Sequence, residues 1–428
     1  MRTGRISRQT DAAHEHAGQM DAGRMDAGHM DAGHMDAGQM NAGHDHSGQA
    51  DARQGNDRFD TTIRPCRRRR SGVTALGVVA IAVALLAAAC GGSDEGAAGE
   101  GTADADTVVL VTYDSFALPD AAAEEFTRRT GAEIEVVATG DAGTMLTTAL
   151  LAAGSPEGDV IFGIDNTLAT RAMSEDLLEP LDAGGSAPSG LDAVPERYRL
   201  DGDAGEHLAP IDTGDVCFNY DTAWFAEHDL APPTTLDQLS EPAYRDLVVT
   251  SSPVTSSPGL AFVIGTVAAY GEDGWLDYWS RLKDNGIRVR PSWDDAYYSD
   301  YTVSGGDRPI VLSYASSPPV EVVFSEGALT EPSSAVMTGS CTEQIEYAGV
   351  LRGAAHPELA RELLEFMLSP EWQRELPLSN FVFPVLDVEL PEEFVRFATP
   401  AESPLRVEPA TIDARRDEWI EQWRELME

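Results

Sequence analysis

The amino-acid sequence predicts an α/β fold with a doubly wound sheet, beginning near residue 107. Three short runs are predicted strands, and they occupy residues 108–112, 133–137 and 159–163. The first is an apolar run that suits a buried parallel strand. Two stretches with helical spacing separate these runs, at residues 120–129 and 144–153, and a glycine that suits a helix end follows each of them. Strands alternating with helices predict a sheet with helices on both of its faces.

Polar side chains follow each of the three predicted strands. They are Tyr113, Asp114 and Ser115 after the first strand, Asp141 after the second, and Asp165 and Asn166 after the third. Ligands of doubly wound sheets bind off the carboxyl ends of the strands, so these residues are candidate ligand contacts. Asp, Ser and Asn are also preferred helix-capping residues, and capping is the alternative interpretation.

The region that follows residue 89 is strongly acidic. The first 89 residues hold 11 of the 30 basic and 10 of the 72 acidic side chains, which leaves a net charge of about −43 on the remainder, with Lys283 as its only lysine. Such a charge argues against nucleic acid and anionic membrane surfaces as partners, because both repel an acidic face. It is compatible with a cationic ligand, although a general acidic bias explains it equally.

Residues 65–89 have the order of a secretory signal. Four consecutive arginines precede an uncharged apolar stretch at residues 73–89, and Cys90 follows that stretch directly. Seventeen residues lie near the lower limit for a membrane-spanning helix. A transmembrane anchor with the same outward topology is therefore the alternative.

Cys90 is a candidate lipidation site. The residues before it resemble a bacterial lipobox, with the difference that Ala87 stands where Leu is usual. Residues 90–106 are rich in Gly, Ala, Asp and Glu, a composition typical of a flexible tether. A lipid on Cys90 and this tether would hold the folded region at the outer face of the cytoplasmic membrane.

Two cysteines, Cys217 and Cys341, remain after the signal, because Cys66 precedes it. In an oxidising compartment a disulfide between them is expected. The alternative is a pair of buried free thiols.

Residues 1–64 are repetitive. A five-residue unit, Met-Asp-Ala-Gly-X, recurs from Met20, and six of the nine histidines lie in the first 46 positions. Imidazole and carboxylate groups can bind Zn, Ni or Cu. A repeat placed before a secretory signal is interpreted instead as disordered sequence or as translated DNA upstream of the true start, and no metal site is assigned to it.

Six short runs, in order along the chain, carry a resemblance to a known family. They are TYDSFA at residues 112–117, FGIDN at 162–166, TSSPGL at 255–260, WDDAY at 293–297, SYASSP at 313–318 and SNFVFPV at 379–385. Together they resemble the periplasmic thiamine-binding proteins of ABC transporters. Residues 357–377 are similar to the late helices of solute-binding proteins in general.

The resemblance implies a two-lobed fold of the type II periplasmic binding proteins. One lobe would comprise residues 107–211 with 341–428, and the other residues 212–340. Closure of the lobes about a hinge would bury the ligand and present it to a membrane permease. The protein is expected to be a monomer, without a cofactor and without catalytic residues, since the sequence lacks the G-x-S-x-G, P-loop and H-E-x-x-H motifs.

A thiamine site should supply aromatic faces, a carboxylate and neutral hydrogen-bonding groups, because the ligand is a flat, permanently charged cation. Trp293, Tyr297, Tyr298 and Tyr301 lie close together in the sequence, either as a ligand wall or as an amphipathic helix packed into a core. The resemblance assigns ligand contact to Tyr113, Trp293, Tyr314 and Phe381. Asp114 is the predicted carboxylate.

The sequence departs from the family at two aromatic positions. Phe381 stands where Trp is expected, and Val320 stands where some relatives have Tyr. Because one aromatic wall is smaller and another is missing, the site is expected to be looser or to favour a related pyrimidine.

The start of a predicted helix offers a second kind of contact. Ser256, Ser257 and Gly259 surround an early proline, so free backbone N–H groups could bind the phosphate of thiamine monophosphate, or the serines could simply cap the helix. Ser317 has the same two interpretations. The alternatives to thiamine are a ferric ion, suggested by the adjacent Tyr297 and Tyr298, and a polyamine, suggested by the acidic charge.

Overall fold

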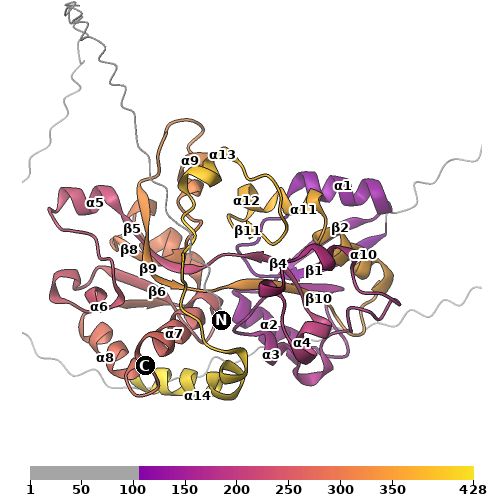
Figure 1. The fold of residues 1–428 in the computed structure, drawn as a ribbon, viewed down its shortest axis with the longest axis horizontal. Helices are drawn as coiled ribbons and strands as arrows, with labels where there is room; N and C mark the ends of the chain where they lie inside the picture. Colours follow the sequence, from indigo (N-terminus) through magenta and orange to yellow (C-terminus); the bar gives the residue numbers. More distant parts are fainter. Residues whose placement is uncertain (1–105) are drawn as a thin grey trace, which may run out of the picture. The chain divides into compact units, whose positions relative to one another are not determined.

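The computed structural model describes residues 106–428. The predicted repeat, signal and lipidation site at Cys90 lie outside the described residues, as does the tether except for its last residue. Within residues 106–428 the chain forms two mixed β-sheets with their helices (Figure 1).

The first sheet has the strand order β11-β4-β10-β3-β1-β2. Its strands are β1 (Thr107–Thr112), β2 (Glu133–Ala138), β3 (Val160–Asp165), β4 (Ala209–Thr213), β10 (Ile345–Val350) and β11 (Phe383–Pro384). Strand β1 pairs in parallel with β2 and β3, whereas β10 runs antiparallel to both β3 and β4. The three strands predicted from the sequence are therefore the parallel half of a larger mixed sheet.

Successive residues of β1 enter two different cores. Leu110 packs with Phe126 of helix α1 (Asp120–Thr130) and Leu363 of helix α10 (Pro357–Met367), while Val111 joins the core that contains Met145 of helix α2 (Ala142–Leu151). Helices thus cover both faces of the sheet, and the predicted α/β fold with a doubly wound sheet is confirmed. The helices associated with this sheet are α1 (Asp120–Thr130), α2 (Ala142–Leu151), α3 (Ala169–Ala172), α4 (Gly202–His207), α10 (Pro357–Met367), α11 (Pro370–Gln373) and α12 (Leu376–Ser379).

Local sequence explains the ends of the first two helices. Helix α1 stops at Gly131, which adopts φ 80° and donates its N–H to Thr127, as the sequence predicted. Helix α2 begins two residues earlier than predicted, because the side chain of Asp141 caps it by accepting the N–H of Ala142 at 2.7 Å.

The second sheet has the strand order β7-β6-β8-β5-β9. Its strands are β5 (Val216–Asp221), β6 (Val248–Ser251), β7 (Arg288–Arg290), β8 (Ile310–Tyr314) and β9 (Ser334–Thr342). One face packs on helix α7 (Ser257–Tyr270), which is buried over most of its length. The other face packs on Tyr297, which lies in the π-helical segment Asp295–Asp300, and on Tyr301, the residue after that segment. The helices here are α5 (Thr222–Glu227), α6 (Leu236–Leu239), α7 (Ser257–Tyr270), α8 (Trp275–Asp284) and α9 (Pro319–Phe324).

The chain passes between the sheets at two adjacent places. It leaves the first sheet between β4 and β5, through Gly214 and Asp215, and returns between β9 and β10, through Glu343 and Gln344. Helix α13 (Glu392–Phe397) contacts α9, and the C-terminal helix α14 (Pro409–Met427) packs mainly on α8 and also on α7 and α3. The sequence-based division placed α14 with the first lobe, whereas most of its contacts are with the second.

A disulfide joins Cys217 to Cys341, at the start of β5 and the end of β9. Both cysteines lie on the second-sheet side of the crossing, two residues from the connecting segments. The bond closes a loop with a sequence separation of 124 residues. In the chain-entropy picture a loop of this length corresponds to about 5 kcal/mol of stabilisation.

Candidate functional site

A cavity of about 200 Å³ lies between the two sheets. Residues at the ends of β1, β4 and β10 meet residues from β8, from α9, and from Asp295–Asp300 with the segment before it. The lining is Tyr113, Ser115, Ala117, Asp212, Gly214, Trp293, Tyr297, Tyr298, Tyr314, Ser317, Val320, Phe324, Gln344, Glu346, Ser379, Asn380, Phe381 and Val382. Half of the predicted ligand contacts are therefore brought together here: Tyr113, Ser115, Trp293, Tyr297, Tyr314, Ser317 and Phe381.

An aromatic wall on the second-lobe side of the cavity is built around Trp293. Its ring stacks on Tyr297 with centroids 4.8 Å apart and an interplanar angle of 23°, and it meets the edge of Tyr298 at 5.6 Å. Tyr314 lies 6.0 Å from Trp293 in a tilted arrangement. Tyr301, by contrast, is fully buried behind the wall and belongs to the core.

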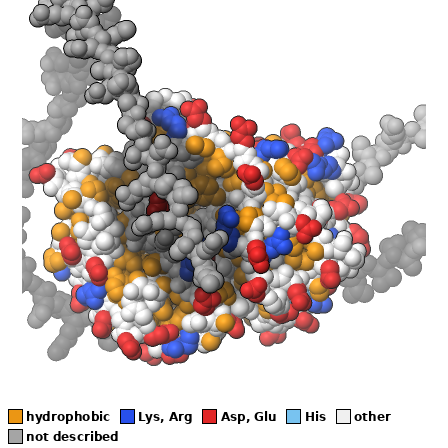
Figure 2. Space-filling model, viewed as in Figure 1, with side chains coloured by type: hydrophobic (Ala, Val, Ile, Leu, Met, Phe, Trp, Pro, Cys, Tyr) orange, Lys and Arg blue, Asp and Glu red, His pale blue; other side chains and the backbone are white. Residues whose placement is uncertain are grey.

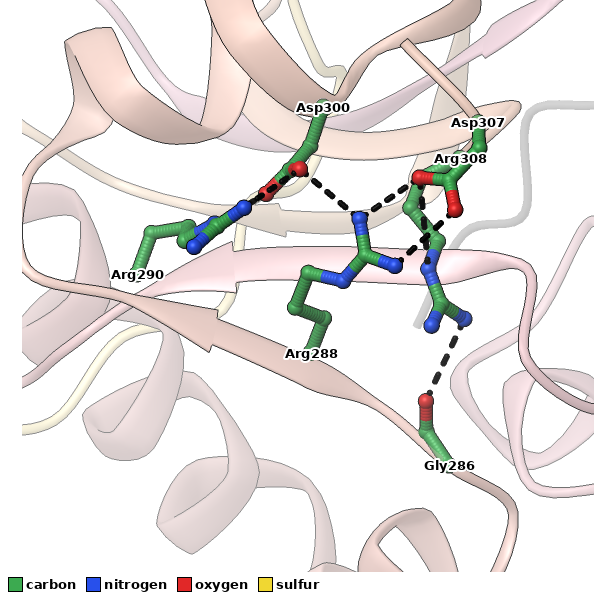
Figure 3. Close-up of polar contacts among 6 residues, drawn as sticks. All are labelled: Gly286, Arg288, Arg290, Asp300, Asp307 and Arg308. Atoms are coloured by element: carbon green, nitrogen blue, oxygen red, sulfur yellow. Dashed lines mark hydrogen bonds and ion pairs between the residues drawn. The ribbon is translucent and has the colours of Figure 1, made fainter.

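An ion-pair network fixes the segment that carries this wall (Figure 3). Asp300, at the end of Asp295–Asp300, receives Arg288 Nη1 and Arg290 Nη2, both at 2.7 Å. The hydrogen bonds from Arg290 and Arg288 hold the pKa of Asp300 below its usual value, so the carboxylate stays charged. Arg288 also binds Asp307 through two hydrogen bonds, of 2.6 and 3.0 Å. The wall is thereby tied to the sheet edge at β7.

Two serine hydroxyl groups orient Trp293. Its indole Nε1 donates to Ser313 Oγ at 3.1 Å, and Ser313 shares a 2.7 Å hydrogen bond with Ser317. Ser317 Oγ also accepts the backbone N–H of Tyr314 at 3.2 Å. The predicted Ser317 turn therefore lines the cavity and at the same time positions two aromatic residues.

Tyr113 forms the opposite wall and lies directly over a glycine of β3. A Cβ atom at Gly163 would be 2.3 Å from Tyr113 Cδ1, and Gly163 has φ +102°, a conformation that residues with a side chain rarely adopt. The tyrosine ring can occupy this place only because residue 163 has no side chain.

Replacing Gly163 with Ala is expected to displace the Tyr113 ring, destabilise the protein by about 1–3 kcal/mol, and weaken ligand binding about tenfold. Chemical denaturation and titration calorimetry measure the two effects. Gly131→Ala is the matched control, because Gly131 also has a positive φ but open space around its missing Cβ. Equal binding by the two variants would show that the position of Tyr113 does not matter for the ligand.

Phe381 enters the cavity from a strained backbone. Its φ is +54°, which is uncommon for a residue with a side chain, and its ring lies 5.7 Å from that of Phe324. The preceding Asn380 holds the loop in place by accepting the N–H of Ala117 and donating to its carbonyl, both at 2.9 Å. Backbone strain that is held by such contacts is typical of functional sites.

The carboxylates that line the cavity are Asp212 and Glu346. They are 1% and 5% exposed, and they face each other directly across the antiparallel pair β4 and β10. Neither residue is among the ligand contacts predicted from the sequence, because their proximity depends on the pairing of two distant strands. The only available signal was that Asp212 is the first residue of the predicted second lobe, residues 212–340.

Asp114, the predicted ligand carboxylate, lies outside the cavity lining. Its side chain is exposed and accepts the N–H of Gly140 at 2.8 Å, which ties the loop after β1 to the loop after β2. The structure therefore places Asp114 in a contact between two loops, whereas the carboxylates that line the cavity are Asp212 and Glu346.

Asp141 and Asp165 also lie outside the lining, and both make contacts between the lobes. Asp141 accepts the backbone N–H of Trp293 at 3.0 Å and that of Ser257 at 3.4 Å. Asp165 accepts the hydroxyl of Ser257 and is further bound by Thr167. These predicted ligand contacts instead join the first lobe to the start of α7 and to the aromatic wall of the second lobe.

The remaining predicted ligand contacts, Asn166, Ser256 and Gly259, also lie outside the cavity lining and make contacts that hold the fold. Asn166 holds the crossing segment by accepting the N–H of Ile345 at 3.0 Å, and Ser256 donates to Ser251 at 2.8 Å. A Cβ at Gly259 would lie 2.6 Å from the backbone of Ser252, so this glycine permits close packing of α7. The predicted phosphate site at the start of α7 faces Asp141 rather than the cavity, because Ser257 donates its N–H to that carboxylate.

Charge and apolar surface are distributed unevenly on the face shown in Figure 2. Acidic side chains are spread around its periphery, whereas apolar side chains gather nearer its centre.

A larger cavity, of about 640 Å³, lies within the first lobe between α1 and α10 and contains none of the predicted ligand contacts. Between residues 106 and 428, no helix is both long enough and apolar enough to cross a membrane.

The two sheets and the cavity between them define a two-lobed binding protein. Residues 155–400 match the family described as bacterial extracellular solute-binding protein, and the chain belongs to that family. This family is a class of binding proteins rather than of enzymes.

Curated relatives have a more specific description. A protein of Salmonella typhimurium named thiamine-binding periplasmic protein is 29% identical over 321 residues, which is 74% of this chain and 92% of the relative. The protein of the same name from Escherichia coli strain K12 is 28% identical over the same shares. That of Haemophilus influenzae is 25% identical and covers 66% of this chain and 79% of the relative.

Solved structures agree with the fold. A structure titled periplasmic thiamin binding protein has a TM-score of 0.67 and 28% identity, and the match covers 78% of this chain and all of that one. Iron-bound HitA from Pseudomonas aeruginosa has a TM-score of 0.58 at 21% identity, and the match covers 75% of this chain and 99% of that one. The fold is that of the type II periplasmic binding proteins, as the resemblance in the sequence implied.

Proposed function

We propose that this protein captures thiamine, or a thiamine phosphate, outside the cytoplasmic membrane and delivers it to an ABC import permease. The observation that carries the proposal is the lining of the cavity. Aromatic rings face one another across it, two buried carboxylates line it, and no Lys, Arg or His stands among the described lining residues. The names of the curated relatives support the same ligand.

The chemistry of the cavity suits a flat organic cation. Ring faces attract positive charge through their quadrupoles, and the attraction increases when the cation is desolvated. Buried carboxylates need a positive partner or a proton, because an unpaired buried charge is very unfavourable. Thiamine provides a cationic thiazolium ring and an aminopyrimidine whose amine can donate hydrogen bonds to Asp212 or Glu346.

Location and delivery are part of the proposal. A secretory signal at residues 65–89 would export the chain, a lipid on Cys90 would anchor it, and residues 90–106 would form the tether. The ligand would leave unchanged, so we propose neither a cofactor nor a chemical step. Membership in an extracellular solute-binding family supports a location outside the cytoplasm.

A ferric ion fits the cavity less well. Burial raises the pKa values of Tyr297 and Tyr298, so the tyrosinate form that binds iron is disfavoured. The ring of Tyr297 is also stacked on Trp293. Among residues 106–428 no group of three or more His, Cys, Asp or Glu side chains is arranged to hold a metal ion.

Titration calorimetry of the purified protein tests the assignment. Thiamine, its mono- and diphosphate, putrescine and Fe(III) are titrated separately, and we expect saturable 1:1 binding of thiamine or a thiamine phosphate. Fe(III) should give no tyrosinate-to-iron colour. Binding of putrescine or coloured binding of Fe(III), with no response to any form of thiamine, would refute the proposal.

A further inference from the structure

Asp212 and Glu346 are direct neighbours across two antiparallel strands. They are register partners in the pairing of β4 with β10, both side chains are buried, and both line the cavity. Side chains opposite each other in such a pair have Cβ atoms about 4.5–5.5 Å apart, and two like charges at that distance repel. The next strand adds a third acid to the same row, because Glu346 is also the register partner of Asp165 on β3.

The hydrogen bonds of the two carboxyl groups differ. Glu346 accepts the Tyr113 hydroxyl at 3.1 Å and, more weakly, the Gln344 amide at 3.4 Å. Both oxygens of Asp212 are buried, and neither receives a donor from the described residues. The register pairing of Asp212 with Glu346 nevertheless places the two carboxyl groups side by side, so that a proton on one of them can be shared with the other.

The titratable groups around the pair are all acidic or neutral. Tyr113 of the loop after β1 and Tyr314 of β8 line the same cavity. Asp165 of β3 and Asp141 before α2 lie outside the lining, and their negative charges act on Glu346. Burial is the main reason that the pKa of Glu346 is raised to about 7, and Asp165 raises it further. Burial and the charge of Glu346 raise the pKa of Asp212 well above its usual value.

We propose that Asp212 and Glu346 share a proton in the empty site, and that binding of the cationic ligand displaces this proton into solution. The inference rests on the proposed function, in that the ligand carries a permanent positive charge. The O–H bond of one carboxyl group breaks, its electron pair stays on the oxygen, and the proton passes to water or buffer. The cation then replaces the proton as the positive partner of the two carboxylates.

Proton displacement makes affinity depend on pH with a defined sign. In the empty site both carboxyl groups have raised pKa values, and a bound cation lowers them again, so the complex holds fewer protons than the free protein. Affinity should therefore rise with pH up to the range in which the empty pair loses its proton, and then level off. Below that range it should fall by up to about tenfold per pH unit for each proton displaced.

The test is calorimetric titration with thiamine at one pH in several buffers of different protonation enthalpy. The slope of observed enthalpy against buffer enthalpy counts the protons released, and near pH 7 we expect between about one half and one per thiamine bound. Infrared spectroscopy provides a second measurement, because the band of a protonated carboxylic acid should be present in the free protein and should weaken when thiamine is added.

Variants assign the proton to the pair. Asp212→Asn and Glu346→Gln, each shown to be folded by thermal unfolding, should release markedly less proton per ligand bound. Asp215→Asn is the matched control, because Asp215 also has a pKa raised by burial, to about 6, but lies in a separate cavity. Its proton release should equal that of the unaltered protein.

Each outcome separates this inference from the function on which it rests. Tight thiamine binding with a zero buffer slope would overturn the proton exchange and leave thiamine capture standing. Proton release that survives in both pair variants but disappears in Asp215→Asn would overturn the assignment to the pair. The absence of any thiamine binding would overturn the proposed function and this inference together.

Discussion

Replacing Trp293 with Ala is expected to lower thiamine affinity about a hundredfold or more while the protein stays folded. The indole forms the centre of the aromatic wall, stacked on Tyr297 at 4.8 Å and oriented by Ser313. Loss of an interface aromatic of this kind costs about 2–4 kcal/mol of binding free energy, and every 1.4 kcal/mol is a factor of ten. The fold should persist, because the indole is only partly buried and the ion pairs at Asp300 remain.

Trp224→Ala is the matched control for this variant. Trp224 is also partly buried and also stacks on a neighbouring ring, that of His228 at 3.8 Å, but it lies outside the cavity lining. Calorimetry should give unchanged affinity for this control, and circular dichroism should show both variants folded. If Trp293→Ala binds thiamine as tightly as the control does, the aromatic wall is not the ligand's contact surface.

The first lobe was largely predictable because its signals are local. The strands β1 and β3 are short, largely apolar runs, β2 alternates acidic with apolar residues at its start, and Gly131 stops α1 where the sequence indicates. Local patterns could not indicate that β10, β4 and β11 would complete the same sheet. Strands β10 and β11 form only after the chain has crossed to the second lobe and returned, and β4 is attached to β3 only through β10. Pairing between distant segments leaves no periodic signal in either one.

The difference between local signals and long-range pairing also explains which residues of the cavity could be predicted from the sequence. Trp293, Tyr314 and Phe381 were found through motifs that can be recognised within one segment. Asp212 and Glu346 lie in different segments, and what makes them a site is the register that places them opposite each other. Their burial also runs against the expectation for acidic residues, which are almost never buried without a partner.

The contacts of the polar residues after β2 and β3 could be predicted only in part from the sequence. Asp141 and Asp165 were expected either to contact the ligand or to cap helices, and both do accept helix-start N–H groups. Their other partners, Ser257 and Trp293, belong to the second lobe. A contact between lobes depends on the orientation of the two sheets about the crossing strands, which no single segment specifies.

The approach of the lobes at Gly143 provides a test of closure that does not touch the ligand. Gly143 is in the first turn of α2, and a Cβ there would lie 2.7 Å from the backbone oxygen of Thr255 in the second lobe. Gly143→Ala should therefore penalise only the arrangement in which the lobes meet, at a cost of about 1–3 kcal/mol for overpacking. A ligand that binds between closed lobes then loses affinity by about ten- to a hundredfold, because its binding-competent state is less populated.

Stability and affinity should respond differently to Gly143→Ala. In the free protein the lobes can separate to relieve the contact, and Ala favours a helix over Gly by up to about 1 kcal/mol, so thermal unfolding should change little while calorimetry shows weaker thiamine binding. Small-angle scattering should show less compaction on adding thiamine than in Thr148→Ala, a control on the exposed side of the same helix. Unaltered affinity with full compaction would mean that the Thr255 backbone yields freely, and that close contact between the lobes at this point is not part of ligand capture.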